Sequence, residues 1–255
     1  MRALRFIAPL AVAMAVAGAP AASSAQDFSN AQRGEIEKII KNYLVANPEI
    51  LEQMTAELTK RQAVVEAAKH QAAVAKHADA IFKSPRGVVV GNQNGDVNFV
   101  EFFDYNCGYC KKAMIDMMEL MKSDPKLRVV LKEFPVLGPG SVEAAQVAVA
   151  VRMQDPTGKK YLDFHQKLLN GRGQADKARA LAAAKDAGLD MAKLEKDLAS
   201  PEIRATLEEN FKIAEDMGLN GTPSYVIGKD VVVGAVGVEG LAKKISEARC
   251  GKATC

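Results

Sequence analysis

The spacing of apolar residues predicts a helical arm over residues 26–86. In this stretch apolar residues recur every three or four positions among Ala, Glu, Lys and Gln, which is the spacing of one helix face. Asn47-Pro48 marks a break between two helical stretches, with proline at a first helical position. The apolar stripe consists of Ile36, Ile39, Ile40, Tyr43 and Leu44 before the break and Ile50, Leu51, Met54 and Leu58 after it.

Residues 87–249 are predicted to form one α/β domain. Short β-rich runs stand at 88–90, 97–103 and 127–133, and a helix from Cys107 to about Lys122 joins the last two in a βαβ unit, for which we expect parallel strands. Glycine and proline break residues 141–217 into helical runs, which stand near 141–153, 160–170, 176–187, 191–199 and 201–217. A hairpin at 224–227 and 231–233 and a helix at 238–249 follow.

This order of elements predicts a thioredoxin-like fold with an inserted helical subdomain, preceded by the helical arm. The arm has too little partner surface within itself, so its apolar face must pack on something else. We expect it to pack on other subunits, as an oligomerisation arm. The alternative is that the arm folds back onto its own domain.

Residues 1–25 have the pattern of a secretory signal peptide. Arg2 and Arg5 precede an apolar run from Phe6 to Ala19, and Ser23 and Ala25 suit the −3 and −1 positions of a cleavage site near Ala25. An uncleaved anchor is the alternative, but the run of about 14 residues is short against the roughly 20 that span a membrane. We therefore expect export, most simply to a bacterial periplasm, without membrane insertion.

The charge and the cysteine content of the chain reduce the number of functions to consider. Removal of Arg2 and Arg5 brings the formal charge of +3 close to neutrality, so no electrostatic argument favours nucleic acid as a partner. No cofactor motif is evident. Four cysteines in an exported chain favour disulfide chemistry, but they are too few for a fold built on disulfides.

Cys107-Gly108-Tyr109-Cys110 is the candidate redox site. Cys107 would lie at a helix N-terminus, where free N–H groups stabilise a thiolate, and Cys110 lies one turn further on. Gly108 and Tyr109, as the spacer, influence the redox potential. The alternatives are half of a zinc site and an inert structural disulfide, and the βαβ context favours redox chemistry.

Thr222-Pro223 directly precedes a predicted strand. Proline cannot donate to a sheet ladder, so it fits a turn into the strand, with a cis bond as one option. In a thioredoxin fold it would face the cysteine pair and present backbone groups to a client. An ordinary turn is the alternative.

The segments 101–110 and 221–228, together with the helical insertion, resemble the DsbA family, most closely its ScsC-like and Com1-like exported members. The resemblance covers about residues 88–249. It implies a nucleophilic Cys107, a resolving Cys110, and a cis Pro223 that holds Thr222 beside the pair.

The resemblance also implies an acid–base role for Glu101, which stands six residues before the first cysteine, where the family has a glutamate that moves protons. Lys132, on the next strand, would be its basic partner. The alternative is that Glu101 and Lys132 are surface positions of their strands.

This chain departs from DsbA at the spacer and before the proline. DsbA has a Pro-His pair between its cysteines and a valine before its proline, whereas this chain has Gly108-Tyr109 and Thr222, which is similar to the isomerase DsbC. The loss of the histidine removes a cation that would stabilise the thiolate. In ScsC-like relatives, arms of this kind hold several catalytic domains together, often three. The combination favours isomerisation or reduction over oxidation.

Cys250 and Cys255 are expected to form a small terminal disulfide, with a second redox relay or a soft-metal site as alternatives. His70 and His77 could share a helix face, but we expect solvated or packing roles, and His165 has no identifiable partner. No metal site is predicted.

The leading hypothesis is a periplasmic disulfide isomerase or reductase. It would act on cysteine-containing exported proteins with an unidentified membrane redox partner, as a homo-oligomer, with a trimer favoured over a dimer. The alternatives are a monomeric DsbA-like dithiol oxidase and a copper-binding stress protein.

Overall fold

The computed structural model describes residues 28–255, and the expected signal peptide at 1–25 lies outside the described residues. The chain divides into two compact units, the first ending at Glu57 and the second comprising Leu58–Cys255. No helix among the described residues is long and apolar enough to cross a membrane.

The first unit contains α1 (Asn30–Ala46) and the start of α2 (Glu49–Lys76). Ser29 begins α1 with a capping box, because its side chain accepts from the Gln32 backbone and the Gln32 side chain accepts from the Ser29 N–H. No residue of α1 is buried. The predicted helices are therefore present, and their apolar stripe is exposed except at the half-buried Ile50.

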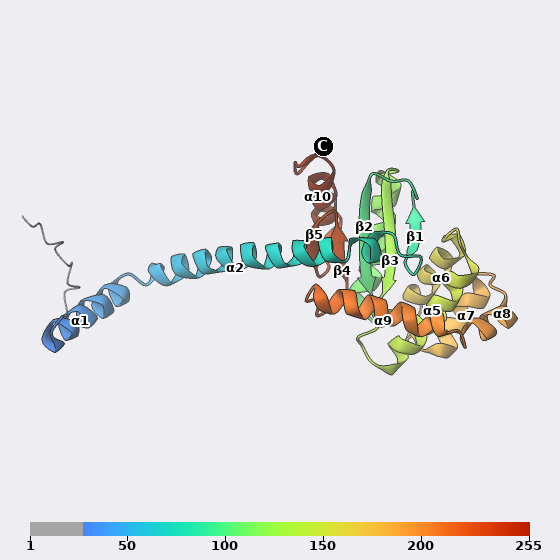
Figure 1. The fold of residues 1–255 in the computed structure, drawn as a ribbon, viewed down its shortest axis with the longest axis horizontal. Helices are drawn as coiled ribbons and strands as arrows, with labels where there is room; N and C mark the ends of the chain where they lie inside the picture. The colour runs from blue at the N-terminus through green and yellow to red at the C-terminus, as the bar shows by residue number, and fades with distance from the viewer. Residues whose placement is uncertain (1–27) are drawn as a thin grey trace, which may run out of the picture. The chain divides into compact units, whose positions relative to one another are not determined.

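A five-stranded sheet forms the centre of the second unit (Figure 1). Its strand order is β1-β3-β2-β4-β5, and its members are β1 (Val88–Gly91), β2 (Val97–Phe103), β3 (Leu127–Glu133), β4 (Ser224–Ile227) and β5 (Asp230–Val233). Strands β2 and β3 are parallel, as the βαβ pattern predicted, and the other pairs are antiparallel.

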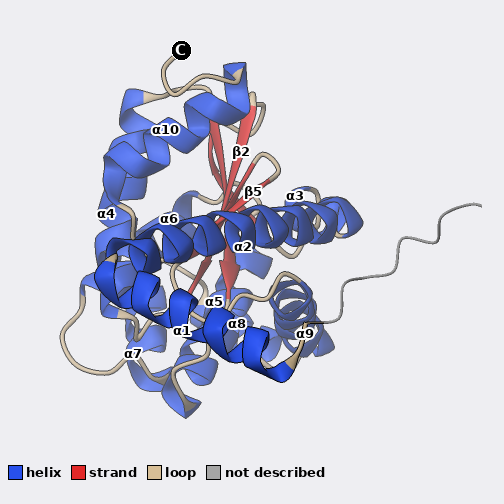
Figure 2. Cartoon of the chain, turned by 90° about the vertical axis from the view of Figure 1, so that its left-hand side faces the viewer, coloured by secondary structure: helices blue, strands red, loops and turns tan. Residues whose placement is uncertain are grey.

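Successive side chains of a strand point to opposite faces of the sheet, so the sheet has one hydrophobic core on each face. Phe99 and Phe103 point to the face covered by α4 (Gly108–Ser123) and α10 (Gly237–Cys250). Val100, Phe102 and Val130 point to the opposite face, covered by α3 (Ala78–Phe82) and α9 (Pro201–Asp216). Figure 2 shows α4 and α10 on one side of the strands and α3 and α9 on the other.

The predicted helical insertion is confirmed between β3 and β4. Each predicted run overlaps one helix, and besides α9 these are α5 (Pro139–Gln154), α6 (Lys159–Asn170), α7 (Lys177–Asp186) and α8 (Met191–Asp197). Proline and glycine separate the helices as expected. The architecture is the thioredoxin-like fold with a helical insertion that the sequence predicted.

The C-terminal part of the predicted arm belongs to the second compact unit. Val74 on α2 and Ile81 on α3 are buried in the core beneath α9. Lys76 and His77 lie 2.8 and 2.6 Å from the Asp216 carboxylate on α9. This part of the chain therefore packs on its own domain, which was the alternative considered for the arm.

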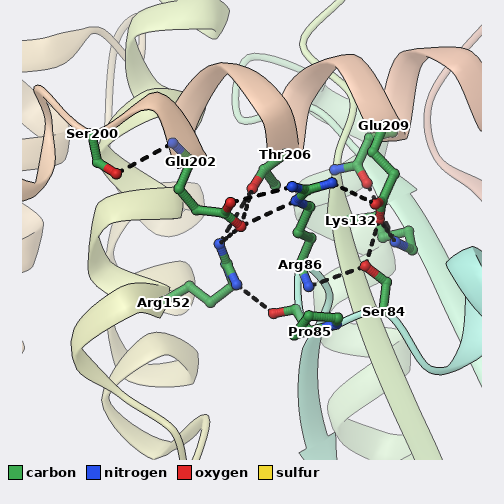
Figure 3. Close-up of polar contacts among 10 residues, drawn as sticks. Ser84, Pro85, Arg86, Lys132, Arg152, Ser200, Glu202, Thr206 and Glu209 are labelled. Carbon is green, nitrogen blue, oxygen red and sulfur yellow. Dashed lines mark hydrogen bonds and ion pairs between the residues drawn. The ribbon is translucent and has the colours of Figure 1, made fainter.

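An ion network then fixes the segment before β1. Arg86 lies 3.1 Å from Glu202 and 3.0 Å from Glu209, both on α9 (Figure 3). Arg152, from α5, lies 3.1 Å from Glu202 and donates to the Pro85 carbonyl. The network joins the start of the sheet to two helices of the insertion.

Candidate active site

The two cysteines of the predicted redox motif lie at the start of α4, directly after the loop that follows β2. Cys107 is the N-cap residue and Cys110 lies in the first turn. Cys107 is 8% exposed, Cys110 is fully buried, and both are free thiols. A client disulfide can therefore reach Cys107, whereas Cys110 is accessible only from within the site.

The surroundings of Cys107 favour its thiolate. The largest influence is a hydrogen bond from the Cys110 thiol, and hydrogen bonds from the Thr222 side chain and the N–H groups of Cys110 and Tyr109 add to it, against partial burial. Together they lower the pKa of Cys107 to about 5. Cys107 is therefore ionised at neutral pH.

The pKa of Cys110 is shifted in the opposite direction, upwards. Its hydrogen bond to Cys107 and its burial raise its pKa, and the negative charge of Glu101 raises it further. The thiol stays protonated at neutral pH. The pair thus consists of one nucleophilic sulfur and one protonated sulfur that must lose a proton before it reacts.

The titration of Cys107 is directly measurable. In the reduced protein we expect the ultraviolet thiolate absorbance to appear with a midpoint near pH 5, so that the rate of attack on disulfides falls only below that pH. Cys110→Ala should raise the midpoint, because it removes the hydrogen bond with the largest effect. A wild-type midpoint near the ordinary cysteine value of about 8.5 would contradict this account.

The Thr222–Pro223 peptide bond is cis and leads into β4. The Thr222 carbonyl oxygen lies 3.2 Å from Cys107 Sγ, which donates to it when protonated. Ser224 donates to the Gly221 carbonyl at 2.7 Å and fixes the loop from the far side. The loop therefore faces the reactive sulfur, at the position expected from the sequence.

Glu101 lies beneath the dithiol and is 2% exposed, so the alternative of a surface strand position does not apply. Burial raises its pKa to about 8, and the negative charges of Cys107 and Asp116 contribute. Its Oε2 atom has no hydrogen-bond partner among the described residues. Glu101 is therefore a buried acid that can exchange a proton near neutral pH.

The expected pairing of Lys132 with Glu101 in the site is wrong. The parallel register pairs Lys132 with Phe102, so its side chain lies on the opposite face of the sheet from Glu101. Its ammonium group lies 3.3 Å from the Asn210 side chain. It also lies 3.7 Å from the Glu209 carboxylate (Figure 3). Lys132 is fully buried there, so it is not a surface residue either.

Asp104 fixes the loop before the cysteines, and the sequence analysis missed it. Its buried carboxylate accepts four hydrogen bonds of 2.7–2.9 Å, from the N–H groups of Asn106, Val136 and Leu137 and from the Ser141 hydroxyl. The Asp-Tyr-Asn segment directly after β2 could have revealed this role, because Asp and Asn side chains form hydrogen bonds with nearby backbone groups in turns.

Asn106 continues this network into the insertion. Its side chain accepts from the Ala175 N–H at 2.7 Å and donates to the Ala175 carbonyl at 2.9 Å. It also donates to Ser141 at 2.9 Å. The redox loop is thus bonded to α5 and to the segment before α7.

A second buried network was also missed. The Tyr161 hydroxyl donates to Glu133 at 2.5 Å and lies 3.4 Å from the Tyr105 hydroxyl, and Tyr105 lies 3.2 Å from His165 Nδ1. Burial lowers the pKa of His165 to about 3, so the ring is neutral. His165 therefore has a structural partner in the loop before Cys107, which no local pattern revealed.

The remaining candidates lie outside this site. A disulfide joins Cys250 to Cys255 in the C-terminal tail. His70 lies 3.4 Å from Glu66, and His77 lies against Asp216. Within residues 28–255, no group of three or more His, Cys, Asp or Glu side chains is arranged to hold a metal ion.

Comparison with known families identifies both parts of the chain. The family model of the DSBA-like thioredoxin domain matches residues 99–246. A second model, the N-terminal domain of the copper resistance protein ScsC, matches residues 32–63. The two matches coincide with the α/β domain and the N-terminal helices.

Solved structures agree with these matches. A thioredoxin-like oxidoreductase from Silicibacter pomeroyi is 40% identical, with a TM-score of 0.63, over 67% of this chain and 96% of that one. Proteus mirabilis ScsC in a transitional conformation is 28% identical, with a TM-score of 0.64, over 88% and 98%. The thiol-disulfide exchange protein α-DsbA2 from Wolbachia pipientis is 30% identical, with a TM-score of 0.65, over 70% and 95%.

Curated proteins give a partial match. The Na⁺/H⁺ antiporter NhaA 1 of Salinispora arenicola is 26% identical over 168 residues, which is 65% of this chain and 25% of the antiporter. The chain thus spans about a quarter of the length of the curated relatives it matches. The antiporter's activity is that of the longer protein.

The family match spans more than half of the chain and includes both the cysteine pair and the cis-proline loop. The Wolbachia structure extends the likeness to a protein described as a thiol-disulfide exchange protein, and the Proteus structure extends it to ScsC. The chain therefore belongs to the DSBA-like thioredoxin domain family and is a thiol–disulfide oxidoreductase of the DsbA and ScsC type.

Proposed function

We propose that this chain is a disulfide isomerase of the periplasm, in which Cys107 is the nucleophile and Cys110 the resolving cysteine. The Cys107 thiolate attacks a client disulfide, a bond forms between Cys107 and one client sulfur, and the other client sulfur leaves as a thiolate. A client thiolate then attacks the mixed disulfide and releases Cys107 with a new client pairing. When rearrangement stalls, Cys110 attacks Cys107 and frees the client.

The observation that carries this proposal is the opposed ionisation of the two cysteines beside the loop that contains the cis Thr222–Pro223 bond. The lowered pKa of Cys107 supplies the attacking thiolate, and the raised pKa of Cys110 delays resolution. The Thr222 carbonyl, 3.2 Å from the sulfur, is positioned to meet an extended client. Thr222 and Pro223 would therefore orient the client strand.

The direction of reaction follows from what stabilises the thiolate. The leading influences that lower the pKa of Cys107 are hydrogen bonds, and neither Gly108 nor Tyr109 supplies a cation. Without a neighbouring cation the thiolate is less stabilised than one that has a cation beside it, so the pair is a weaker oxidant than a dithiol of that kind. This favours reshuffling over net oxidation.

Oligomerisation would bring several such sites to one client. The stripe of α1 is exposed, with Ile39 65% and Tyr43 61% accessible, and an apolar helix face of this kind needs a partner. We propose further copies of this chain as that partner, in a trimer rather than a dimer. The match to the ScsC N-terminal domain, over residues 32–63, covers the same segment.

The proposal includes a location in the periplasm, exported client proteins and a membrane redox partner. A Salmonella enterica relative, 28% identical, is described as a periplasmic thioredoxin-like protein, and residues 1–25 have the pattern of a signal peptide. The clients would be exported proteins with cysteines. A membrane redox partner would keep the pair reduced, as isomerisation requires.

The proposal is tested with scrambled ribonuclease in a glutathione buffer. We expect the mature chain to restore ribonuclease activity faster than the buffer alone. Fast oxidation of reduced peptides without ribonuclease recovery would instead favour the dithiol oxidase.

A copper-binding role is the second candidate, because the family matched at residues 32–63 is described as a copper resistance protein. Thiolates are soft ligands that suit Cu(I), and Cys107 is ionised at neutral pH. Cu(I) titration of the wild type and of a Cys107→Ser, Cys110→Ser variant separates the two candidates. Equal copper stoichiometry would exclude the cysteine pair as the metal site.

A further inference from the structure

A cavity of about 510 Å³ lies beside β1, an edge strand of the sheet. Besides β1 itself, its wall comes from segments that are far apart in the chain: residues 83–85, the turn at Gln93-Asn94, Arg128 at the start of β3, and the end of α5 with the loop that follows it. The volume is within the range of about 300–1,000 Å³ that is typical of small-molecule sites. All these segments belong to the second compact unit.

The loop between α5 and α6 closes one side of the cavity. Gly158, the N-cap residue of α6, has a φ of 72°, and a Cβ atom there would lie 2.3 Å from the Val89 carbonyl oxygen. Only glycine therefore lets this loop approach β1 so closely. The Asp155 carboxylate accepts from the N–H groups of Thr157 at 3.1 Å and Tyr161 at 2.9 Å, which holds the loop in place.

Arg128, in the wall of the cavity, is a half-buried cation without an acidic partner among residues 28–255. Its Nη1 atom donates to the Phe82 carbonyl at 3.0 Å and to the Asn98 side chain at 2.8 Å. Within the same part of the chain, its Nε and Nη2 atoms have no hydrogen-bond partner. Burial lowers the pKa of Arg128, and no neighbouring acid offsets this effect.

The two unbonded atoms of Arg128 form one edge of its guanidinium group. Their N–H groups are nearly parallel, and their spacing matches two oxygens of a carboxylate or a phosphate, which arginine binds with two hydrogen bonds. Partial burial of a cation costs free energy that an anion beside it offsets. The free edge is therefore a ready partner for an anion in the cavity.

The other charges of the wall are compatible with an anion. Lys83 pairs with Asp79 at 2.9 Å, but both side chains are about four-fifths exposed, so solvent weakens this pair. Arg152 is neutralised by Glu202 at 3.1 Å (Figure 3). Against the three basic residues of the wall, Asp155 and Glu202 supply two negative charges, so one positive charge remains.

We propose that this cavity binds a small organic anion, whose carboxylate or phosphate group is held by the free edge of Arg128 and by Lys83. The site is separate from the dithiol. In the parallel register Arg128 is opposite Asn98, five positions before Phe103 at the end of β2, which is about 17 Å along the strand. The proposal therefore goes beyond thiol–disulfide exchange and does not depend on it.

The first test uses the mature wild-type chain in a buffer free of polyvalent anions. Citrate is the probe for a carboxylate group and glycerol 3-phosphate the probe for a phosphate group. In calorimetry we expect at least one of them to bind with a Kd tighter than about 1 mM, and the tighter one identifies the group. In nitrogen-15 NMR spectra the signals of Lys83, Asn94 and Arg128 should move, whereas those of Cys107 and Cys110 should not.

Variants then test the two cations. Arg128→Gln should weaken binding of the probe roughly ten- to a hundredfold, because it removes charged hydrogen bonds. Arg128→Lys keeps the charge without the two parallel N–H groups, so it should restore only part of the affinity. Lys83→Gln should weaken binding about two- to fivefold. Lys126→Gln, an exposed residue outside the cavity wall, is the matched control and should change affinity less than about twofold.

The rate of reaction with oxidised glutathione and the circular dichroism spectrum show whether each variant is folded. Lys83→Gln, whose side chain is exposed, decides the result if the Arg128 variants do not fold. Unchanged affinity in a folded Arg128→Gln or in Lys83→Gln, or movement of NMR signals only outside the cavity, overturns the proposal. A redox-active chain that binds neither probe overturns the anion site alone, whereas a chain that binds a probe but cannot reactivate ribonuclease overturns the proposed function alone.

Discussion

Replacing Cys107 with serine is expected to reduce ribonuclease reactivation to the level of the glutathione buffer, a loss on the order of 10³-fold or more. A serine hydroxyl is not ionised at neutral pH, whereas Cys107 has a pKa of about 5. Cys110, fully buried and protonated, cannot replace it as the attacking group. The initial rate of ribonuclease recovery measures the effect.

Two cysteine variants control this result. Cys110→Ser should leave Cys107 able to attack a client disulfide, but no second thiol would then displace the client from Cys107. Covalent complexes with clients should therefore accumulate and be visible on non-reducing gels. Replacing both Cys250 and Cys255 with serine should leave activity unchanged, because they form an exposed disulfide in the C-terminal tail. Substantial activity in Cys107→Ser would contradict the assignment of the nucleophile.

Deleting the N-terminal helices up to Glu57 is expected to lower ribonuclease reactivation by roughly ten- to a hundredfold while leaving the rate of reaction with glutathione unchanged. The remaining unit, Leu58–Cys255, contains the whole sheet and the cysteine pair. Isomerisation would suffer because the client loses the high local concentration of several linked sites. Light scattering should report a fall from an oligomer to a single chain.

A point variant tests the same idea without removing chain. Ile39→Glu places a charge on the exposed apolar stripe of α1 and should dissociate the oligomer. Lys41→Gln changes the charge of the same helix by an equal amount and should leave the oligomer intact. A wild type, Ile39→Glu variant and deletion that each have the mass of one chain would favour the monomeric oxidase.

The sequence predicted the redox loop well because its signals are local. The apolar run that becomes β2 is followed at once by Cys107, and a helix start after a strand places the first sulfur at an N-terminus. Proline directly before a β run likewise fixed Pro223 at the entrance to β4. Neither inference needed knowledge of distant contacts.

Lys132 illustrates where such reasoning fails. The strand that contains it was predicted correctly, but the face of each side chain depends on how β3 pairs with β2. A shift of one residue in register moves every side chain to the other side of the sheet. Resemblance suggested Glu101 as the partner of Lys132, and the register placed Lys132 beside α9 instead.

The Cys107–Cys110 pair, the strands around it and the helical insertion were thus determined by the sequence itself, through periodicity and turn residues that act over a few positions. Only the tertiary structure decided what surrounds the pair: Asp104 bonded to Val136 and Ser141, and Tyr225 opposite Glu101 in the register of β2 and β4. These residues lie far apart in the chain and share no spacing, because their meeting depends on sheet register and helix packing rather than on local propensity.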